Sequence, residues 1–140
     1  MNLLIQKLRD TATLPEYAHA GDAGMDIFSD VQATLRPGER RVIETGIAME
    51  IPTGYVGLIW EKSGRASQEG LGTLAGVIDS GYRGEVKIVL INHGDEPIVI
   101  ERGQKIAQLL VQAVASVSIK QVNSLESSSR ATAGFGSTGL

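Results

Sequence analysis

The chain has 140 residues, which is long enough for one domain with its own core and short for two. Its 13 Lys and Arg against 16 Asp and Glu give a net charge of −3, which argues against a nucleic-acid-binding surface. No cysteine is present, so disulfides and thiolate metal sites are excluded, and two histidines are too few for a histidine-based zinc centre without several carboxylates. Any metal is therefore expected to be a hard cation such as Mg²⁺, held through oxygen atoms.

The sequence shows neither a membrane span nor an export signal. No stretch approaches the roughly 20 apolar residues that a membrane helix needs, and a polar residue interrupts the apolar run within Met1–Lys7. The charged and apolar regions of a signal peptide are also missing. We therefore expect a cytoplasmic protein.

Short apolar runs between Gly, Pro, Asp and Asn favour strands and turns over helices, and Gly is frequent, with 17 residues. Residues 84–91 read as a strand buried on both faces, because Val86, Ile88 and Leu90 alternate with Lys87, Val89 and Ile91, so that apolar residues occur in both alternating sets. One short helical turn is expected around 66–71. The pattern predicts an all-β fold, a jelly-roll-like sandwich or barrel. The expected strands are 3–8, 42–45, 47–51, 55–60, 84–91, 97–100 and 105–118.

The composition changes after residue 120. Residues 121–132 are mostly Gln, Asn, Ser, Arg, Thr and Ala, with little apolar surface to bury. We therefore expect a β domain over 1–120, followed by a flexible linker and C-terminal lid over 121–140.

The C-terminal tail carries the spacing G-x-G-x-x-G at Gly134, Gly136 and Gly139. A dinucleotide fingerprint also needs a strand before the glycines, a helix after them and a later acidic residue, which this sequence does not carry. Glycines still allow backbone N–H groups to approach an anion closely, and the ring of Phe135 can stack on a base. We interpret the tail as a segment that closes over a nucleotide phosphate.

Two glycine-rich segments carry carboxylates. Asp22 and Asp26 lie four residues apart in Ala20–Ile27, and Asp79 ends an apolar run three residues before Tyr82. A carboxylate such as Asp79 can act as a general base on a water, and a tyrosine ring can pack on a sugar. Ordinary turns with Asp side chains explain the same residues, and their spacing leaves both interpretations open.

Two further segments suit an anion. Lys62, Ser63, Gly64 and Arg65 combine two cations, a hydroxyl and a flexible backbone, although a solvated turn explains them as well. Gln108 interrupts an apolar run, so its amide needs a partner, which is a ligand, a water or another group of the protein.

Taken together and in this order, the segments resemble the five motifs of the trimeric dUTP pyrophosphatase (dUTPase) family. Ala20–Ile27 resembles the first motif, Lys62–Gly64 the second, 76–84 the third, 103–108 the fourth and 130–139 the fifth. The resemblance implies a jelly-roll homotrimer with three active sites at subunit interfaces. It also implies Mg²⁺-dependent hydrolysis of dUTP to dUMP and pyrophosphate, which limits uracil in DNA and supplies dUMP for dTMP synthesis.

The resemblance also implies a role for each matching residue. Asp79 would orient and deprotonate the water that attacks the α-phosphorus, Tyr82 would pack against the deoxyribose and disfavour a 2′-hydroxyl, and Asp26 would hold the metal through its water shell. The other implied substrate contacts are Val77, Ile78, Lys87 and Phe135 at the uracil, Thr73 at the uracil or sugar, Lys62, Ser63, Gly64 and Gln108 at the phosphates, and Arg130, Gly136, Ser137 and Thr138 in the lid.

The chain departs from the family pattern at several positions. The second motif usually opens Pro-Arg-Ser-Gly-Leu, whereas here it reads Glu61-Lys62-Ser63-Gly64-Arg65, so the bidentate guanidinium is replaced by an ammonium. Thr73 replaces a common Asn, and Ala131 replaces the Gly after the Arg of the fifth motif. We expect none of these changes to abolish activity.

Two alternative functions fit the same fold. A dCTP deaminase shares it but needs a Glu five residues after the Gly of the third motif, where this chain has Val89. A non-catalytic regulatory relative is the second alternative. The presence of Asp79, Arg130 and Phe135 argues against a loss of catalysis.

Overall fold

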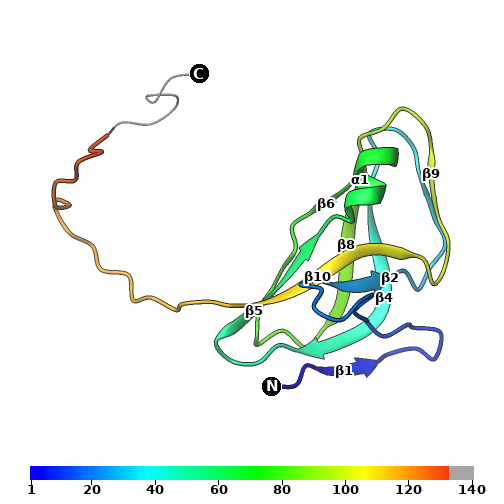
Figure 1. Ribbon diagram of the computed structural model, residues 1–140, viewed down its shortest axis with the longest axis horizontal. Helices are drawn as coiled ribbons and strands as arrows, with labels where there is room; N and C mark the ends of the chain where they lie inside the picture. The colour runs from blue at the N-terminus through cyan, green and yellow to red at the C-terminus, as the bar shows by residue number, and fades with distance from the viewer. Residues whose placement is uncertain (133–140) are drawn as a thin grey trace.

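The computed structural model describes residues 1–132, in which ten strands surround a core and one short helix lies at its edge (Figure 1). The fold is all-β and jelly-roll-like, as predicted. The elements are β1 (Leu4–Lys7), β2 (Met25–Phe28), β3 (Ala33–Leu35), β4 (Arg40–Glu50), β5 (Tyr55–Trp60), α1 (Ser63–Glu69), β6 (Leu71–Leu74), β7 (Val77–Ile78), β8 (Glu85–Asn92), β9 (Ile98–Ile100) and β10 (Lys105–Ala113).

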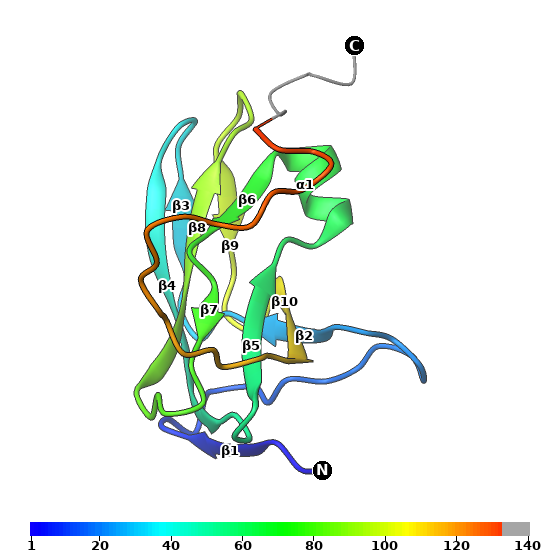
Figure 2. The same cartoon turned by 90° about the vertical axis from the view of Figure 1, so that its left-hand side faces the viewer.

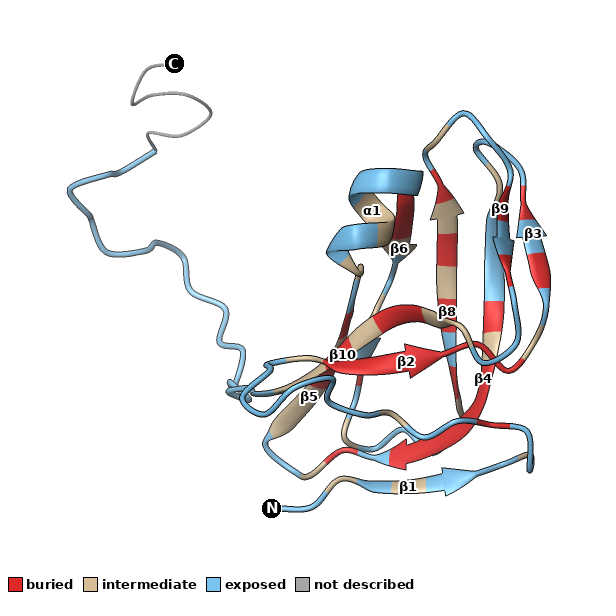
Figure 3. Ribbon diagram, turned by 45° about the vertical axis from the view of Figure 1, so that its right-hand side comes forward, coloured by how far each residue is buried: buried red, intermediate tan, exposed pale blue. Residues whose placement is uncertain are grey.

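Two four-stranded antiparallel sheets form the body, with the strand orders β1-β4-β8-β6 and β2-β10-β5-β7, and β3 pairs with β9 in a small third sheet (Figure 2). Their inner faces bury a core of aliphatic side chains (Figure 3). The residues with almost no exposure include Ile27, Leu35, Ile43, Leu90, Ile106 and Leu109.

The prediction that residues 84–91 are buried on both faces is wrong. In β8 the side chains of Val86, Ile88 and Leu90 are buried, whereas Val89 and Ile91 are only half-buried and Lys87 is exposed. Side chains of a strand alternate between its two faces, and only one face of β8 points toward the second sheet. Only the residues on that face enter the core.

The two strands predicted at 42–45 and 47–51 are one continuous strand, β4. Its pairing with β8 shifts in register between Glu44 and Ala48, around Gly46, whose φ is +69°. A Cβ at this position would lie 2.7 Å from the Cβ of Ala12 and 2.8 Å from Oδ2 of Asp30. Gly46 therefore forms a bulge within a strand, where the sequence pattern suggested a break.

The predicted helical turn at 66–71 begins and ends earlier, since α1 spans Ser63–Glu69. It ends at Gly70, which has a left-handed backbone with φ +72° and donates its N–H to the carbonyl of Ala66. A Cβ on Gly70 would lie 2.6 Å from the backbone nitrogen of Gly94, so glycine is required there. No residue of α1 is buried.

The strand predicted to reach residue 118 ends at Ala113. After Val114, whose N–H donates to the carbonyl of Gly54, the chain leaves the body (Figure 1). Residues 114–132, here called the arm, are exposed along their length. Within residues 1–132 no helix is long and apolar enough to cross a membrane.

Candidate active site

One group of predicted residues lines a pocket of about 230 Å³ between β7 and β8, here called the hairpin pocket. The predicted residues Val77, Ile78, Asp79, Tyr82 and Lys87 all contribute to its wall. The structure therefore brings the residues implied at the uracil and the sugar together with the implied catalytic carboxylate. The remaining lining residues are Ile59, Ala75, Gly76, Glu85 and Val86.

A tight turn before β7 shapes this pocket. Ala75 and Gly76 both have positive φ, +61° and +107°, and the carbonyl of Gly76 accepts a hydrogen bond of 2.8 Å from the N–H of Ile59. A Cβ on Gly76 would lie 2.8 Å from the carbonyl oxygen of Ile59, so only glycine allows this approach. The turn places β7 at the free edge of its sheet, beside β5.

Tyr82 is held in place by its own hairpin. Its backbone N–H donates to the carbonyl of Asp79 at 3.0 Å, and its hydroxyl donates to the carbonyl of Glu85 at 2.9 Å. A Cβ on Gly84 would lie 2.4 Å from that hydroxyl oxygen, so Gly84 leaves the space that the ring fills. The half-exposed ring forms a fixed flat wall of the pocket.

Asp79 is exposed, and among residues 1–132 its carboxylate has no hydrogen-bond partner and no ion pair. Lys87, on β8, lies with its ammonium 3.8 Å from Glu44 and 3.7 Å from Glu85. The carboxylate of Asp79 is thus available to bind a water molecule, whereas the nearby cation is partly neutralised by the protein.

A second group, here called the charged cluster, consists of Asp26, Lys62 and Lys105. Asp26 lies on β2 with 6% of its side chain exposed; Lys62 Nζ pairs with one carboxylate oxygen and Lys105 Nζ lies 2.6 Å from the other. Burial opposes the charged form of Asp26, but the hydrogen bonds from Lys105 and Lys62 outweigh it and hold the pKa of Asp26 below its ordinary value. The hydrogen bond to Asp26 raises the pKa of Lys105.

Gln108 lies on β10 directly between Asp26 and Trp60 in the sheet register. Its Nε2 donates to the backbone carbonyl of Glu61 at 2.7 Å. Its Oε1 faces Gly24, where a Cβ would lie only 2.5 Å away. The amide nitrogen that the sequence left without a known partner is therefore bound by the protein.

Lys62, Ser63 and Gly64 form the start of α1. Lys62 precedes the helix with an extended backbone, and Ser63 and Gly64 are exposed. The guanidinium of Arg65 donates twice to Oε2 of Glu69, at 2.9 and 2.7 Å, one turn later on the same helix. Arg65 is thus bound to Glu69, so a contact between its guanidinium and a phosphate would require that pair to open.

Thr73, on β6, faces the same region. Its N–H and hydroxyl both donate to Oε1 of Glu61, at 3.1 and 2.9 Å. Sequence reasoning named Thr73 as a site residue but did not assign a role to Glu61, Lys105 or Gly24. Lys105 lies within the segment that resembles the fourth motif, and Glu61 is a departure from the second motif. The sequence could therefore have indicated both residues as candidates for the site.

The metal prediction rests on Asp26 alone. Among residues 1–132 no group of three or more His, Asp or Glu side chains could hold a metal ion. Both oxygens of Asp26 already face ammonium groups. The carboxylate fits an indirect contact with the water shell of a phosphate-bound Mg²⁺, and it does not fit a direct ligand in this arrangement.

The two groups lie apart on one sheet. Asp26 and Gln108 lie on β2 and β10, the hairpin pocket adjoins β7, and β5 runs between them in the order β2-β10-β5-β7. No hydrogen bond or ion pair joins the groups among the described residues.

Arg130 lies in the arm that leaves the body. The predicted lid residues Phe135, Gly136, Ser137 and Thr138 lie outside the described residues.

The chain is similar to known proteins over almost its whole length. A family model for dUTPase matches residues 10–139. The chain is 48% identical over 142 residues to the deoxyuridine 5′-triphosphate nucleotidohydrolase of Clostridium acetobutylicum, with 100% of this chain and 98% of the relative covered. The enzyme of the same name from Gloeobacter violaceus is 44% identical over 143 residues, with 99% and 97% covered.

Solved structures show the same likeness. A variant of the Staphylococcus bacteriophage 80alpha dUTPase with dUpNHpp gives a TM-score of 0.94 at 34% identity, covering 99% of each chain. A variant dUTPase from phage phi11 of S. aureus, described with a structural Mg(II) ion, gives a TM-score of 0.85 at 33% identity, with 91% of this chain and 100% of the other covered. The chain therefore belongs to the dUTPase family.

Proposed function

We propose that this chain is a dUTP diphosphatase, which hydrolyses dUTP to dUMP and pyrophosphate. The observation that carries the proposal is the hairpin pocket, in which Asp79 stands beside the fixed ring of Tyr82 at a free strand edge, and its carboxylate has no hydrogen bond or ion pair among residues 1–132. The activity would keep uracil out of DNA by removing dUTP, and it would supply dUMP for dTMP synthesis.

In the proposed reaction Asp79 acts as a general base. It orients a water and takes its proton while the water oxygen forms a bond to the α-phosphorus. The bond between that phosphorus and the oxygen bridging to the β-phosphate breaks, and pyrophosphate leaves with the bond's electron pair. Because phosphoryl transfer needs little covalent help, correct placement of this water and neutralisation of the phosphates carry most of the catalysis.

The free edge of β7 is proposed to select the base. Among residues 1–132 only one edge of β7 pairs with a neighbouring strand, β5. Backbone groups of Val77 and Ile78 are therefore available to hydrogen-bond the edge of a uracil, as an added strand would. Lys87 adds a further contact on the β8 side. The ring of Tyr82 would lie against the deoxyribose and leave no room for a 2′-hydroxyl.

The charged cluster and the polar groups beside it are proposed to hold the triphosphate. Lys62 supplies charge, while Ser63 and Gly64 at the start of α1 and Gln108 on β10, outside the cluster, supply polar contacts. Mg²⁺, when bound, would be held mainly by phosphate oxygens and water, and it would neutralise charge that the protein cations leave. Arg130 and the lid residues Phe135, Gly136, Ser137 and Thr138 are proposed to cover the bound nucleotide.

A homotrimer with a site at each subunit interface would bring the two groups together. Within one chain they are separated by the width of β5, and no hydrogen bond or ion pair joins them among the described residues. A neighbouring copy can place its charged cluster against the hairpin pocket without any change in either fold. The separation supports this assembly, which sedimentation or light scattering would test directly.

The test of the activity is a substrate panel. We expect the chain to release pyrophosphate from dUTP in the presence of Mg²⁺ and to act far more slowly on dTTP, dCTP and UTP. Ammonia release from dCTP would instead identify a deaminase, and binding of dUTP without turnover would identify a non-catalytic relative. Either result would overturn the proposal.

A further inference from the structure

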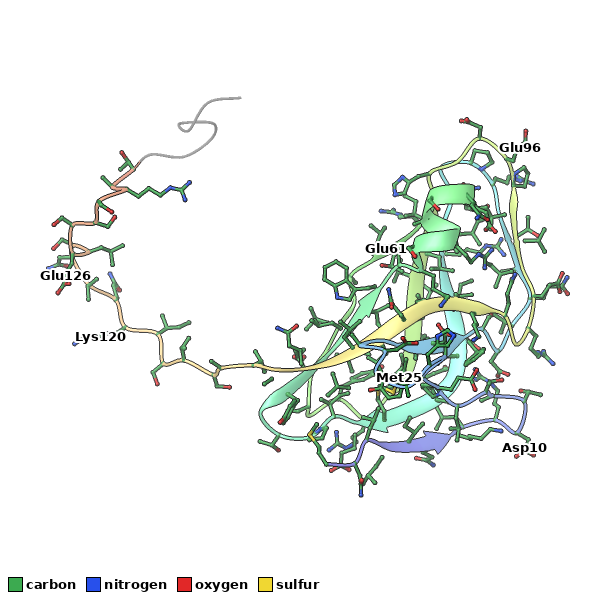
Figure 4. All side chains as sticks on the ribbon, in the orientation of Figure 1. Asp10, Met25, Glu61, Glu96, Lys120 and Glu126 are labelled. Carbon is green, nitrogen blue, oxygen red and sulfur yellow. The ribbon has the colours of Figure 1, made fainter. Side chains whose placement is uncertain are left out.

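Glu61 occupies a junction in the proposed phosphate-binding region. It lies between β5 and α1, immediately before Lys62 (Figure 4). Its backbone carbonyl accepts the hydrogen bond from Gln108, and its carboxylate accepts the two from Thr73. Lys62, Gln108 and Thr73, all predicted to contact substrate, are therefore connected through Glu61. Lys62 is its neighbour in the chain, and the other two are hydrogen-bonded to it.

The two departures from the family pattern meet at this junction. Position 61 usually carries a proline, which has no side chain able to accept a hydrogen bond, and position 73 usually carries an asparagine. In this structure the carboxylate of Glu61 receives both polar hydrogens of Thr73. Glu61 at one position supplies the acceptor and Thr73 at the other supplies the donors. Each departure from the family pattern therefore provides the hydrogen-bond partner of the other.

We infer that Glu61 is a positioning residue, which fixes the start of α1 and the amide of Gln108 for the outer phosphates of dUTP. The inference rests on the dUTP hydrolysis proposed above. Thr73 acts through Glu61 in this scheme, since its N–H and hydroxyl are both bound to the carboxylate and are not directed at the substrate.

The packing of α1 explains why such a contact is needed. No residue of the helix is buried, so the core does not fix where the helix begins. Its far end is held by the hydrogen bond of 2.9 Å from His93 N–H to the carbonyl of Gly70. At its near end the Glu61–Thr73 contact ties the segment to β6. Hydrogen bonds therefore set the position of Lys62, Ser63 and Gly64.

A carboxylate beside bound phosphates would otherwise oppose binding. In this structure the backbone N–H of Glu61 and the N–H and hydroxyl of Thr73 donate hydrogen bonds to the Glu61 carboxylate. These bonds stabilise its charged form and keep the pKa of Glu61 below its ordinary value, although desolvation opposes this. The role is therefore to accept hydrogen bonds, and the negative charge is incidental to it. Glutamine keeps the Oε1 acceptor without the charge, so it separates the two properties.

The experiment compares Glu61→Ala, Thr73→Val, their combination and Glu61→Gln with the unmodified chain. We expect Glu61→Ala to lower kcat/KM for dUTP about tenfold, because a small displacement of positioned groups is costly. Inhibition by dUMP, which lacks the outer phosphates, should change less than about twofold. The double variant should be no worse than Glu61→Ala alone, since both changes remove one contact. Glu61→Gln should lie within about threefold of the unmodified chain, because the acceptor remains.

Glu101→Ala and Thr34→Val serve as matched controls outside the site, and thermal melting checks that each variant folds. Three results would overturn the inference: Glu61→Ala with normal kcat/KM, an equal loss of dUMP and dUTP binding, or Glu61→Gln as impaired as Glu61→Ala. Failure of the unmodified chain to release pyrophosphate from dUTP would instead reject the proposed function, and the inference with it.

Discussion

The hairpin pocket and the charged cluster contain the same kind of acidic residue in opposite environments. Asp79 is exposed, and its carboxylate has no partner among residues 1–132, whereas Asp26 is buried between two ammonium groups. A carboxylate that binds no protein group can accept a proton from water, while one whose two oxygens face lysines is kept charged. The difference supports the proposed roles, which are catalysis for Asp79 and electrostatic organisation for Asp26.

The difference also predicts how each residue divides its contribution between activity and stability. Removing Asp79 leaves no buried group unsatisfied, so the fold should not respond. Removing Asp26 leaves the ammonium groups of Lys62 and Lys105 without their common partner, so stability and phosphate binding should both fall.

The largest expected effect is that of Asp79→Asn. Loss of a general base should lower kcat for dUTP by about 10²–10⁴-fold, because asparagine cannot take the proton of the attacking water. Pyrophosphate release measures the rate, and calorimetric titration with dUTP should give an affinity close to normal. Near-normal turnover in this variant would remove Asp79 from the mechanism.

Asp26→Asn should have a smaller effect, and on stability. We expect a loss of about 1–3 kcal/mol in the free energy of unfolding, below the usual range for a broken buried pair because both lysines keep access to water. Urea unfolding measures this loss, with Asp22→Asn on an exposed loop as the control. Equal midpoints for Asp26→Asn and the unmodified chain would show that the pairs contribute no net stability.

The contribution of Asp26 should depend on pH in a defined direction. Because its folded pKa lies below the ordinary value of 3.8, its stabilisation is fully present above pH 3.8 and is lost as the pH falls through the lower, folded value. The difference in unfolding free energy between the unmodified chain and Asp26→Asn should therefore shrink in that acidic window and stay constant near neutrality. A difference that grows on acidification would contradict the assigned direction.

The smallest expected effect is that of Tyr82→Phe. The change removes the hydrogen bond to the carbonyl of Glu85, worth about 0.5–1.5 kcal/mol, but leaves the ring. Activity on dUTP should fall only a few-fold, and UTP should still be rejected. Tyr82→Ala, which removes the wall itself, should raise the relative activity on UTP. If Tyr82→Phe instead lost its discrimination between dUTP and UTP, the hydroxyl and not the ring would be responsible for rejecting UTP.

The hairpin pocket could be predicted because its residues are close in sequence. Residues 76–84 contain β7 and the turn that follows it, and the pairing of β7 with β5 is enough to gather Asp79 and Tyr82. The strands with long apolar runs, such as β5 and β8, were predicted for the same reason, since the run lies within the strand itself, although the burial of both faces predicted for β8 is wrong.

The charged cluster could not be predicted in this way, because its contacts cross between strands. Lys105 reaches Asp26 only through the pairing of β10 with β2, whose register shifts between Lys105 and Ala107. β2 itself was not predicted as a strand, since Ala20–Ile27 resembles a turn. β3, β6 and β7 were missed because two to four residues are too few to show a period.

The most direct test of the account is hydrolysis of dUTP in water labelled with heavy oxygen, followed by mass analysis of both products. If Asp79 directs water at the α-phosphorus, the label will appear in dUMP and be absent from pyrophosphate. Label in pyrophosphate would place the attack on the β-phosphorus and contradict the proposed mechanism.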